Sequence, residues 1–299
     1  MRAFSLAATL IFASFLLAAC AVVGKVAEIS SNFVEDPKTA AALKQSGESI
    51  GKAAKEISPE EEYYIGRAVG ASILARYKLY KGAPKLTAYL NEIVNAIAIN
   101  SKNPEIYNGY HAAILDSPEI NAFATSGGHI LIARGLLESA KSEDELAAVI
   151  AHEIAHIQLR HSLNAIKTSR WTQAATTTGV STLSAVGDGK DLGKLSDAFG
   201  DIVGDVVSVL VNSGYSKSQE FDADAKALSL LSDAGYDPFA LVAMLEELQK
   251  NQASRAGGFN KTHPSPTDRI KSVKKHLSKY AAATTKSARV SRYNAAMKK

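Results

Sequence analysis

The 299-residue chain contains one cysteine, one tryptophan and three methionines, and its charge is nearly balanced. A single cysteine, Cys20, cannot form an internal disulfide, so cysteine usage does not indicate a redox compartment. The net charge is only +4, and no basic patch with interleaved aromatic residues occurs, which argues against nucleic acid as a partner. The hydrophobic fraction of 46% is ample for a core, and the length fits one large domain or two small ones.

The long apolar run at the N-terminus is too short to span a bilayer comfortably. It reads LAATLIFASFLLAA, follows one positive charge and ends directly before Cys20. Small residues before the only cysteine resemble a bacterial lipobox, which predicts a signal peptide at 1–19 and lipidation on Cys20. By the sorting rule for lipoproteins, Ala21 in place of aspartate implies the outer membrane. The alternative is an ordinary signal peptide with an incidental cysteine.

The rest of the chain divides into three parts by composition. Residues 20–57 are polar and alanine-rich and are expected to be a lipidated tether. Residues 58–280 contain the periodic segments and are expected to fold into one domain. Residues 281–299 carry five basic and no acidic side chains and are expected to be a flexible tail.

Periodicity and prolines predict a mainly helical domain. Prolines start helices at 59, 84, 238 and 266, and short apolar β-branched runs predict strands at 111–115 and 129–133. Residues 135–164 are expected to be helical, and 195–213 to form an amphipathic helix after a glycine-containing loop at 180–194. The predicted fold class is α+β, with one small antiparallel sheet beside the helix that carries the motif described next.

The pentapeptide HEIAH at 152–156 is the strongest chemical signal in the chain. On a helix, residues four apart share one face, so the imidazoles of His152 and His156 can bind one zinc ion. Glu153 follows the first histidine and can take a proton from a water on the metal, because zinc lowers the pKa of that water from about 15.7 to about 7. The product is a hydroxide able to attack a peptide carbonyl.

The surroundings of this motif predict a buried helix. Ser142 and Glu145 form a capping box at its start. Apolar residues then recur at helical spacing, namely Leu146, Val149, Ile150, Ile154 and Ile157. Two histidines and a glutamate would be costly inside such a helix without a metal or partners, which favours a metal site over coincidence.

A catalytic zinc site usually has three protein ligands, so a third must come from elsewhere. The pattern HExxHxxGxxH is absent, because Leu159 and Ser162 stand at its glycine and third-histidine positions. His161 lies nine residues after His152, on the opposite face of a continuous helix, and is expected at the surface.

Glu220 is the better candidate for the third ligand. Ser216 and Gln219 form a second capping box, so Glu220 lies at the start of a helix and shares a face with Asp224. Glu220 can bind zinc, and Asp224 can accept the free ring N–H of a ligating histidine. The alternative is that these acids are first-turn residues favoured only by the helix dipole.

HEIAH followed by ExxxD at 220–224 resembles the gluzincin zinc metallopeptidases that include the CAAX prenyl protease, HtpX, the mitochondrial Oma protease and BepA. The lipobox suggests a bacterial lipoprotein member of that family. Further matches are NAFATSGGHILIARGLL at 121–137, SKSQEFDAD at 216–224, AGYDP at 234–238 and THPSPTDRI at 262–270. The matches span roughly residues 58–278, and a predominantly helical zincin domain is the implied fold.

The resemblance implies one zinc ion per chain on His152, His156 and Glu220, with Glu153 as the general base. It also implies that His263 and Arg269 face the site, where either of them could stabilise the oxyanion together with zinc. In BepA-like members the histidine of the HP motif can occupy the open zinc position and keep the enzyme latent. Three roles therefore stay open for His263, which are a plug on the zinc, stabilisation of the oxyanion, and a surface histidine before a proline turn.

Gluzincins hold an extended substrate on the edge strand of their sheet by β-augmentation. The candidate edge is the segment Asn121, Ala122, Phe123 and Ala124, which precedes the glycine pair at 127–128. Glycine allows the backbone to approach a ligand closely. The Phe123 side chain is equally a candidate core residue.

The predicted function is a zinc-dependent endopeptidase that is lipid-anchored at the periplasmic face of the outer membrane. Its expected substrates are envelope proteins, in the quality control of misfolded or misassembled outer-membrane proteins, and the outer-membrane assembly machinery is a candidate partner. The alternative is a non-catalytic chaperone or scaffold lipoprotein that binds strands in the same cleft. The presence of Glu153 argues against a purely binding role, because binding zinc needs no glutamate there.

Overall fold

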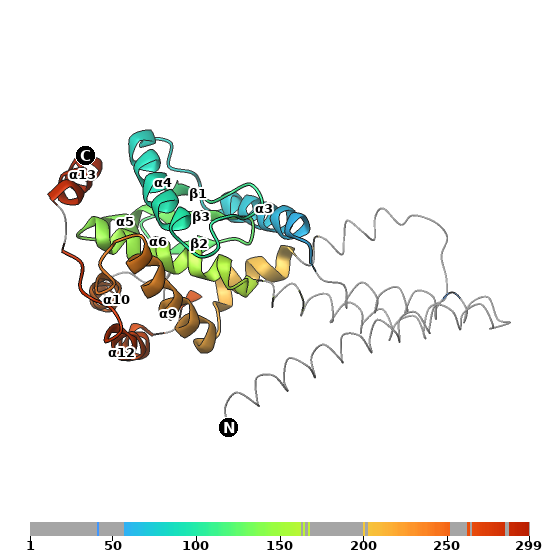
Figure 1. Cartoon of the computed structure of the whole chain (residues 1–299). Helices are drawn as coiled ribbons and strands as arrows, with labels where there is room; N and C mark the ends of the chain where they lie inside the picture. The colour runs from blue at the N-terminus through green and yellow to red at the C-terminus, as the bar shows by residue number, and fades with distance from the viewer. Residues whose placement is uncertain are drawn as a thin grey trace, which may run out of the picture. The chain divides into compact units, whose positions relative to one another are not determined.

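The computed structural model describes residues 57–162, 203–251, 262–263, 265–284 and 287–298, together with residues 41, 164, 167 and 200. The signal peptide, Cys20, the loop at 180–194 and all of the tether except residues 41 and 57 lie outside the described residues. Residues 59–163 and 203–299 form one compact unit, which contains every labelled helix and strand in Figure 1. Among the described residues, no helix has both the length and the apolar character that a membrane span requires.

Two helices precede the sheet, and both begin at a proline as expected. α3 is Pro59–Arg76 and α4 is Pro84–Ile99. Proline is tolerated in the first turn because its missing N–H would have no partner within the helix. Three glutamates at 60–62 add favourable negative charge to the N-terminal end of α3.

Three strands form a mixed sheet, β1 (His111–Leu115), β2 (Ala122–Ala124) and β3 (His129–Ala133). β3 lies in the middle, antiparallel to β2 and parallel to β1. The expected antiparallel pairing is therefore correct for β2 and β3 and wrong for β1. The connection explains this, because the chain leaves β1, runs back along the far edge as β2 and turns through residues 125–128 into β3.

The two edges of the sheet are treated differently. The edge at β1 is partly covered by the segment 78–80, because Tyr80 N–H donates to Ile114 O at 2.8 Å and Asp116 N–H donates to Lys78 O at 2.7 Å. The other edge is β2, which contacts the helix that carries HEIAH. The predicted edge strand thus lies at an edge and beside that helix.

The stretch 135–164, expected as one helix, forms α5 (Arg134–Ser139) and α6 (Glu143–Gln158). The break lets Ser142 cap α6, with its hydroxyl accepting the Glu145 N–H at 3.1 Å. The Glu145 carboxylate accepts from the N–H of the residue before Ser142 at 2.8 Å, so only half of the expected capping box forms.

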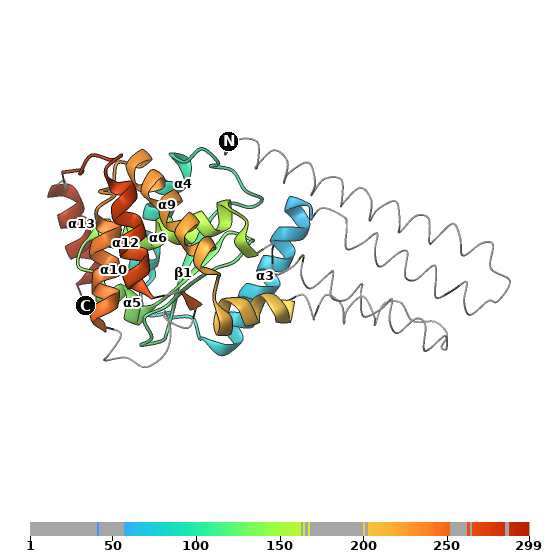
Figure 2. The same ribbon diagram turned by 90° about the horizontal axis from the view of Figure 1, so that it is seen from below.

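Helices also make up most of the second half of the unit in the part that the structure describes. Residues 203–208 are helical and lead into a π-helical turn, η1 (Val209–Ser213), so the described end of the expected amphipathic helix is confirmed. α9 (Lys217–Asp233) begins with the complete Ser216–Gln219 capping box. α10 (Ala240–Asn251) and α12 (Pro266–Leu277) follow, and Figure 2 shows them side by side.

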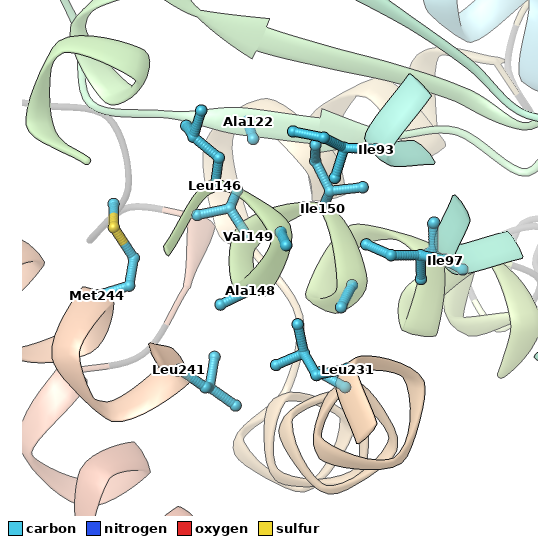
Figure 3. Packing of buried hydrophobic residues seen from close by; sticks show 14 of the residues in the cluster. Ile93, Ile97, Ala122, Leu146, Ala148, Val149, Ile150, Leu231, Leu241 and Met244 are labelled. Carbon is cyan, nitrogen blue, oxygen red and sulfur yellow. The ribbon is translucent and has the colours of Figure 1, made fainter. Parts of the chain in front are cut away.

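α6 is the centre of the hydrophobic core (Figure 3). Its apolar side chains pack against those of α4, β2, α9 and α10, among them Ile93, Ile97, Ala122, Leu231, Leu241 and Met244. Each large aliphatic side chain fully buried in this way contributes about 1.5–3 kcal/mol of transfer free energy. The core therefore fixes α6 from several sides, and with it the HEIAH motif.

The tail expected to be flexible contains α13 (Ser287–Met297), so the expectation is wrong for this stretch. Arg289 is buried, and its Nη1 donates to Asp144 Oδ1 at 2.7 Å. Arg292 Nη2 donates to Glu143 Oε1 at 2.5 Å. Both acids are buried in the first turn of α6, so α13 neutralises the charged end of the helix that carries HEIAH.

Replacing Arg289 with alanine should lower the free energy of unfolding by about 3–5 kcal/mol, because Asp144 would stay buried without its cation. Urea unfolding measures this loss. As a matched control, Lys274→Ala removes an exposed pair with Glu246 and should cost no more than about 1 kcal/mol. A loss for Arg289→Ala as small as the control would show that α13 does not support α6.

Candidate metal centre

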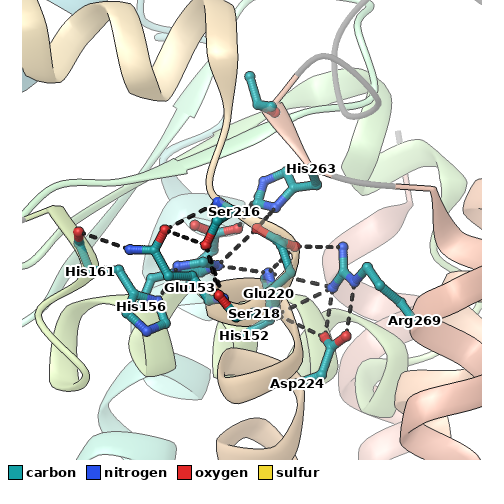
Figure 4. Close-up of polar contacts among 12 residues, drawn as sticks. His152, Glu153, His156, His161, Ser216, Ser218, Glu220, Asp224, His263 and Arg269 are labelled. Atoms are coloured by element: carbon teal, nitrogen blue, oxygen red, sulfur yellow. Dashed lines mark hydrogen bonds and ion pairs between the residues drawn. The ribbon is translucent and has the colours of Figure 1, made fainter. Parts of the chain in front are cut away.

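α6 presents His152, Glu153 and His156 together, and all three are buried (Figure 4). The four-residue spacing puts both imidazoles on one face, as the sequence predicts. Their Nε2 atoms lie 3.0 Å apart and the rings meet edge to face. Both histidines therefore direct a nitrogen toward the same point.

α9 packs against α6 and brings Glu220 and Asp224 to these histidines. Glu220 Oε2 lies 3.5 Å from His152 Nε2, and Glu220 Oε1 lies 3.4 Å from His156 Nε2. Asp224 Oδ1 lies 3.0 Å from His152 Nδ1, the ring nitrogen on the other side. Both carboxylates are buried. This argues against the alternative that they are only first-turn acids favoured by the helix dipole.

His263 and Arg269 reach the same cluster from the C-terminal part of the chain. His263 Nδ1 lies at hydrogen-bond distance, 2.8 Å, from Glu220 Oε1, and its Nε2 lies 4.0 Å from Glu153 Oε1. Arg269, on α12, donates to both oxygens of Asp224 at 2.9 and 2.7 Å. His263 is buried, so the third alternative, a surface histidine, is wrong.

The spacing of these atoms fits a single metal ion. Ligand atoms at the corners of a tetrahedron, about 2.0–2.1 Å from a zinc ion, lie about 3.3 Å from one another. The nitrogens of His152 and His156 and the oxygens of Glu220 are separated by 3.0–3.5 Å. With His263, the group offers four buried ligand atoms within 4.8 Å of one another. Two imidazoles and a carboxylate are a donor set that suits zinc.

The charges in the cluster are set by burial and by close partners. Burial acts to raise the pKa of Glu220, but the charges of His263 and Arg269 and the hydrogen bonds from both histidines outweigh it and hold that pKa well below its usual range. The pKa of Asp224 is lowered to about 2 because Arg269 outweighs burial. Both carboxylates are therefore ionised at neutral pH.

Glu153 differs from the other two carboxylates. Burial raises its pKa, and the nearby charge of His263 opposes this only in part. Its Oε1 atom is buried and makes no hydrogen bond to any described residue. A buried carboxylate oxygen without a donor is costly, so this position fits a bound group such as a metal ion with its water.

His161 was expected at the surface, and this prediction is wrong. It is buried, and its Nδ1 lies 2.9 Å from His156 Nδ1. The prediction assumed a continuous helix, but α6 ends at Gln158 and Arg160 has a φ of 54°. Burial lowers the pKa of His161, which keeps the ring neutral.

Tyr215 also belongs to the site, although it is part of no motif that predicts the metal centre. Its ring stacks on that of His156, with centroids 4.1 Å apart and an angle of 16° between the planes. A signal was available, because Tyr215 directly precedes the Ser216 cap of α9 and so lies beside the turn that carries Glu220.

The predicted edge segment starts close to this cluster. The Asn121 side chain accepts from the Ala122 N–H at 2.9 Å and from the Thr262 hydroxyl at 3.2 Å, and Thr262 directly precedes His263. Phe123 is buried and its ring centroid lies 5.4 Å from that of Tyr77, so its side chain belongs to the core.

Residues 84–277 match the model of Peptidase family M48, and this is more than half of the 299 residues. The chain therefore belongs to Peptidase family M48, a family of zinc metallopeptidases. Together with the cluster of three histidines and a glutamate that could hold a metal ion, this membership supports a zinc-dependent hydrolase of peptide bonds.

Three similar proteins carry names that describe proteases. The Beta-barrel assembly-enhancing protease of Escherichia coli (strain K12) is 26% identical over 211 residues, which cover 70% of this chain and 41% of that protein. Metalloprotease LoiP of the same strain is 29% identical over 196 residues, covering 66% and 71%. The Mitochondrial metalloendopeptidase OMA1 of Schizosaccharomyces pombe is 29% identical over 197 residues, covering 64% and 53%. The chain thus spans about two-fifths of the length of the barrel-assembly relatives that it matches.

We expect the purified protein to hold about one zinc ion per chain, and His156→Ala or Glu220→Gln to remove it, because each change leaves only two of the three proposed ligands. Elemental analysis after gel filtration measures the zinc. Asp222→Asn is a matched control, since Asp222 is an exposed acid in the same turn of α9 and should not affect zinc. Tight, stoichiometric zinc in both ligand variants would contradict the assignment.

Proposed function

We propose that this chain is a zinc-dependent endopeptidase of the bacterial cell envelope, with His152, His156 and Glu220 as metal ligands. The observation that carries the proposal is the spacing of their ligand atoms, 3.0–3.5 Å, beside the buried carboxylate of Glu153. When bound, zinc would supply the Lewis acid that activates water and polarises the scissile carbonyl.

Glu153 is assigned the role of general base. It lies in the same turn as His152 and His156 and directs an oxygen without a hydrogen bond among the described residues toward His263. In this role it takes a proton from the attacking water and returns it to the leaving amine. Because burial raises the pKa of Glu153, its protonated side chain is stable enough to hold the proton between these two steps.

Arg269 is assigned to hold the carboxylates. Its guanidinium makes two hydrogen bonds with Asp224 and lies 3.1 Å from Glu220 Oε2, so it offsets both buried charges. Asp224 in turn accepts from Nδ1 of His152, which leaves Nε2 of that ring for the metal. Because Arg269 is occupied by these carboxylates, the oxyanion contact is not assigned to it.

His263 is proposed to restrain the enzyme. Its ring lies over the ligand cluster, with Nδ1 held by Glu220 and Nε2 directed toward Glu153. It is 4% exposed and Glu153 is 1% exposed, so the ring and its segment shield the base from solvent. A substrate carbonyl must enter beside this ring, which makes displacement of His263 part of substrate binding.

His263→Ala should increase the basal cleavage of an unfolded protein substrate, because the shield over Glu153 is removed while all three proposed ligands remain. Cleavage is measured on a fluorescently quenched casein with zinc content checked in parallel. A fall of about a hundredfold or more would instead assign the ring to oxyanion stabilisation. His111→Ala, at an exposed histidine on β1, is the control.

Backbone groups of β2 are proposed to bind an extended substrate. The ladder with β3 uses the carbonyl of Asn121 and the N–H of Thr125, so in an antiparallel pair the groups of Ala122 and Ala124 point to the outer edge. The Asn121 side chain contacts the Ala122 N–H, as a substrate carbonyl would. Phe123 contributes from the core by fixing the strand, and the substrate pairs with backbone.

Envelope proteins are the proposed substrates, with outer-membrane proteins and their assembly machinery as the specific target and partner. The lipobox at Cys20 supports attachment to the outer membrane through lipid. The names of the barrel-assembly relatives support a role in the quality control of outer-membrane proteins. All of these assignments follow from sequence signals together with the proposed protease activity.

Glu153→Gln should keep zinc and fold but lose proteolysis by at least about a hundredfold, because the amide has nearly the same size and cannot take a proton. Mass spectrometry of peptides released from envelope proteins, wild type against variant, tests both the activity and the substrate class. If Glu153→Gln fully complements a deletion strain, the alternative of a non-catalytic chaperone or scaffold lipoprotein is correct. Activity within tenfold of wild type would assign the base to another group.

A further inference from the structure

The chain reverses direction directly after the helix that carries HEIAH. α6 ends at Gln158, and Arg160 adopts a left-handed conformation with a φ of 54°. A non-glycine residue in this conformation is uncommon and needs support from its surroundings. Here the Arg160 guanidinium is fixed on Glu62 of α3, with Nη2 2.6 Å and Nε 3.0 Å from Oε2. The contact between Arg160 and Glu62 therefore stabilises this turn.

This turn brings His161 back against His156. The two Nδ1 atoms are 2.9 Å apart, and the ring centroids are 4.9 Å apart at 73°. The Gln219 side chain, part of the cap of α9, donates to the His161 carbonyl at 3.3 Å. Tyr215 covers the face of the His156 ring. Groups from α3, α9 and the turn thus hold His161 in place against one ring edge.

Two facing ring nitrogens form a hydrogen bond only when one carries a proton and the other does not. His156 directs Nε2 toward His152 and Glu220, so Nε2 is the nitrogen left for a metal. A neutral imidazole that binds a metal through Nε2 carries its proton on Nδ1. His156 must then be the donor, and His161 the acceptor with its own proton on Nε2.

We propose that His161 is a positioning residue for the zinc site, which accepts the Nδ1–H of His156 and so fixes both the tautomer and the orientation of that ring. The inference rests on the proposed function, because it takes His156 to be a metal ligand. It gives each ligating histidine its own partner, Asp224 for His152 and His161 for His156.

The two partners differ in charge. Asp224 is a carboxylate held by Arg269, whereas His161 is an imidazole, which carries no negative charge in either protonation state. A carboxylate acceptor makes the ligating ring more basic than a neutral acceptor does. His161 therefore fixes the geometry of His156 without placing a further negative charge beside Glu153 and Glu220.

The test compares two replacements of His161 in the full chain. His161→Phe keeps a ring of similar size and removes the acceptor, and His161→Asn supplies a carbonyl oxygen close to the position of Nδ1. Loss of a partner of this kind lowers metal affinity about 10–100-fold. We expect this loss in His161→Phe and an affinity within about tenfold of wild type in His161→Asn, measured by chelator competition. The absorption spectrum of the cobalt-substituted protein should change in His161→Phe and stay close to wild type in His161→Asn.

Two controls separate this inference from others. His111→Phe alters an exposed histidine on β1 and should leave zinc affinity unchanged. His156→Ala tests the ligand itself, so zinc retained by that variant contradicts the proposed function. Zinc lost by His156→Ala but bound at wild-type affinity by His161→Phe overturns the positioning role alone. Equal losses in His161→Phe and His161→Asn assign His161 to packing and also overturn it. If His161→Phe does not fold, His161→Asn alone decides. A zinc affinity more than about tenfold below wild type in that variant overturns the positioning role, and an affinity within about tenfold supports it.

Discussion

α6 and α9 pack against each other, and the metal centre depends on how closely they approach. Helical spacing puts Ala148 and Ala155 on the same face of α6 as His152, and Ala223 and Ala227 beside Glu220 and Asp224 on α9. All four alanines are fully buried. Bonds from zinc to its ligands tolerate deviations of only about 0.2 Å, so a larger side chain in this contact would separate the carboxylate from the imidazoles.

The second requirement is the balance of buried charge. Three carboxylates, those of Glu153, Glu220 and Asp224, lie inside a helical bundle, where an uncompensated charge is very costly. Arg269 offsets two of them, which explains why α12 must pack against α9. Glu153 is the carboxylate that Arg269 does not bind directly, and it is also the one whose pKa is raised. The structure thus distinguishes two ionised carboxylates that serve geometry from one whose proton can move.

Local signals in the sequence predicted much of this arrangement. The spacing in HEIAH, the capping box at Ser216 and the prolines at 59, 84 and 266 depend only on neighbouring residues, and each of these predictions is correct. The helix expected to start at Pro238 begins at Ala240 instead, because residues 238–239 form a turn. The α+β class followed from hydrophobic periodicity, which is also a local pattern. For Phe123 the sequence alone does not separate a core role from a substrate role, because alternation along a strand does not say which face is covered.

Features that depend on distant segments could not be predicted. The return of His161 needs the Arg160 turn, which Glu62 supports from more than ninety residues earlier in the chain. The parallel pairing of β1 follows from the path of the connection and leaves no local pattern. The helix at Ser287–Met297 resembles a loose basic tail until its arginines are seen beside the buried acids of α6. In each case the local structure depends on a contact with a segment that is distant in the sequence.

The order of the centre along the chain has a consequence for when it can exist. Its parts are supplied by His152 and His156, then Glu220, then Arg269, which is thirty residues from the C-terminus. A growing or partly unfolded polypeptide therefore contains only fragments of the centre, because binding a metal through such scattered ligands requires the completed fold. The proposed metal centre, and any activity that depends on it, is therefore completed only when these separate segments have folded together.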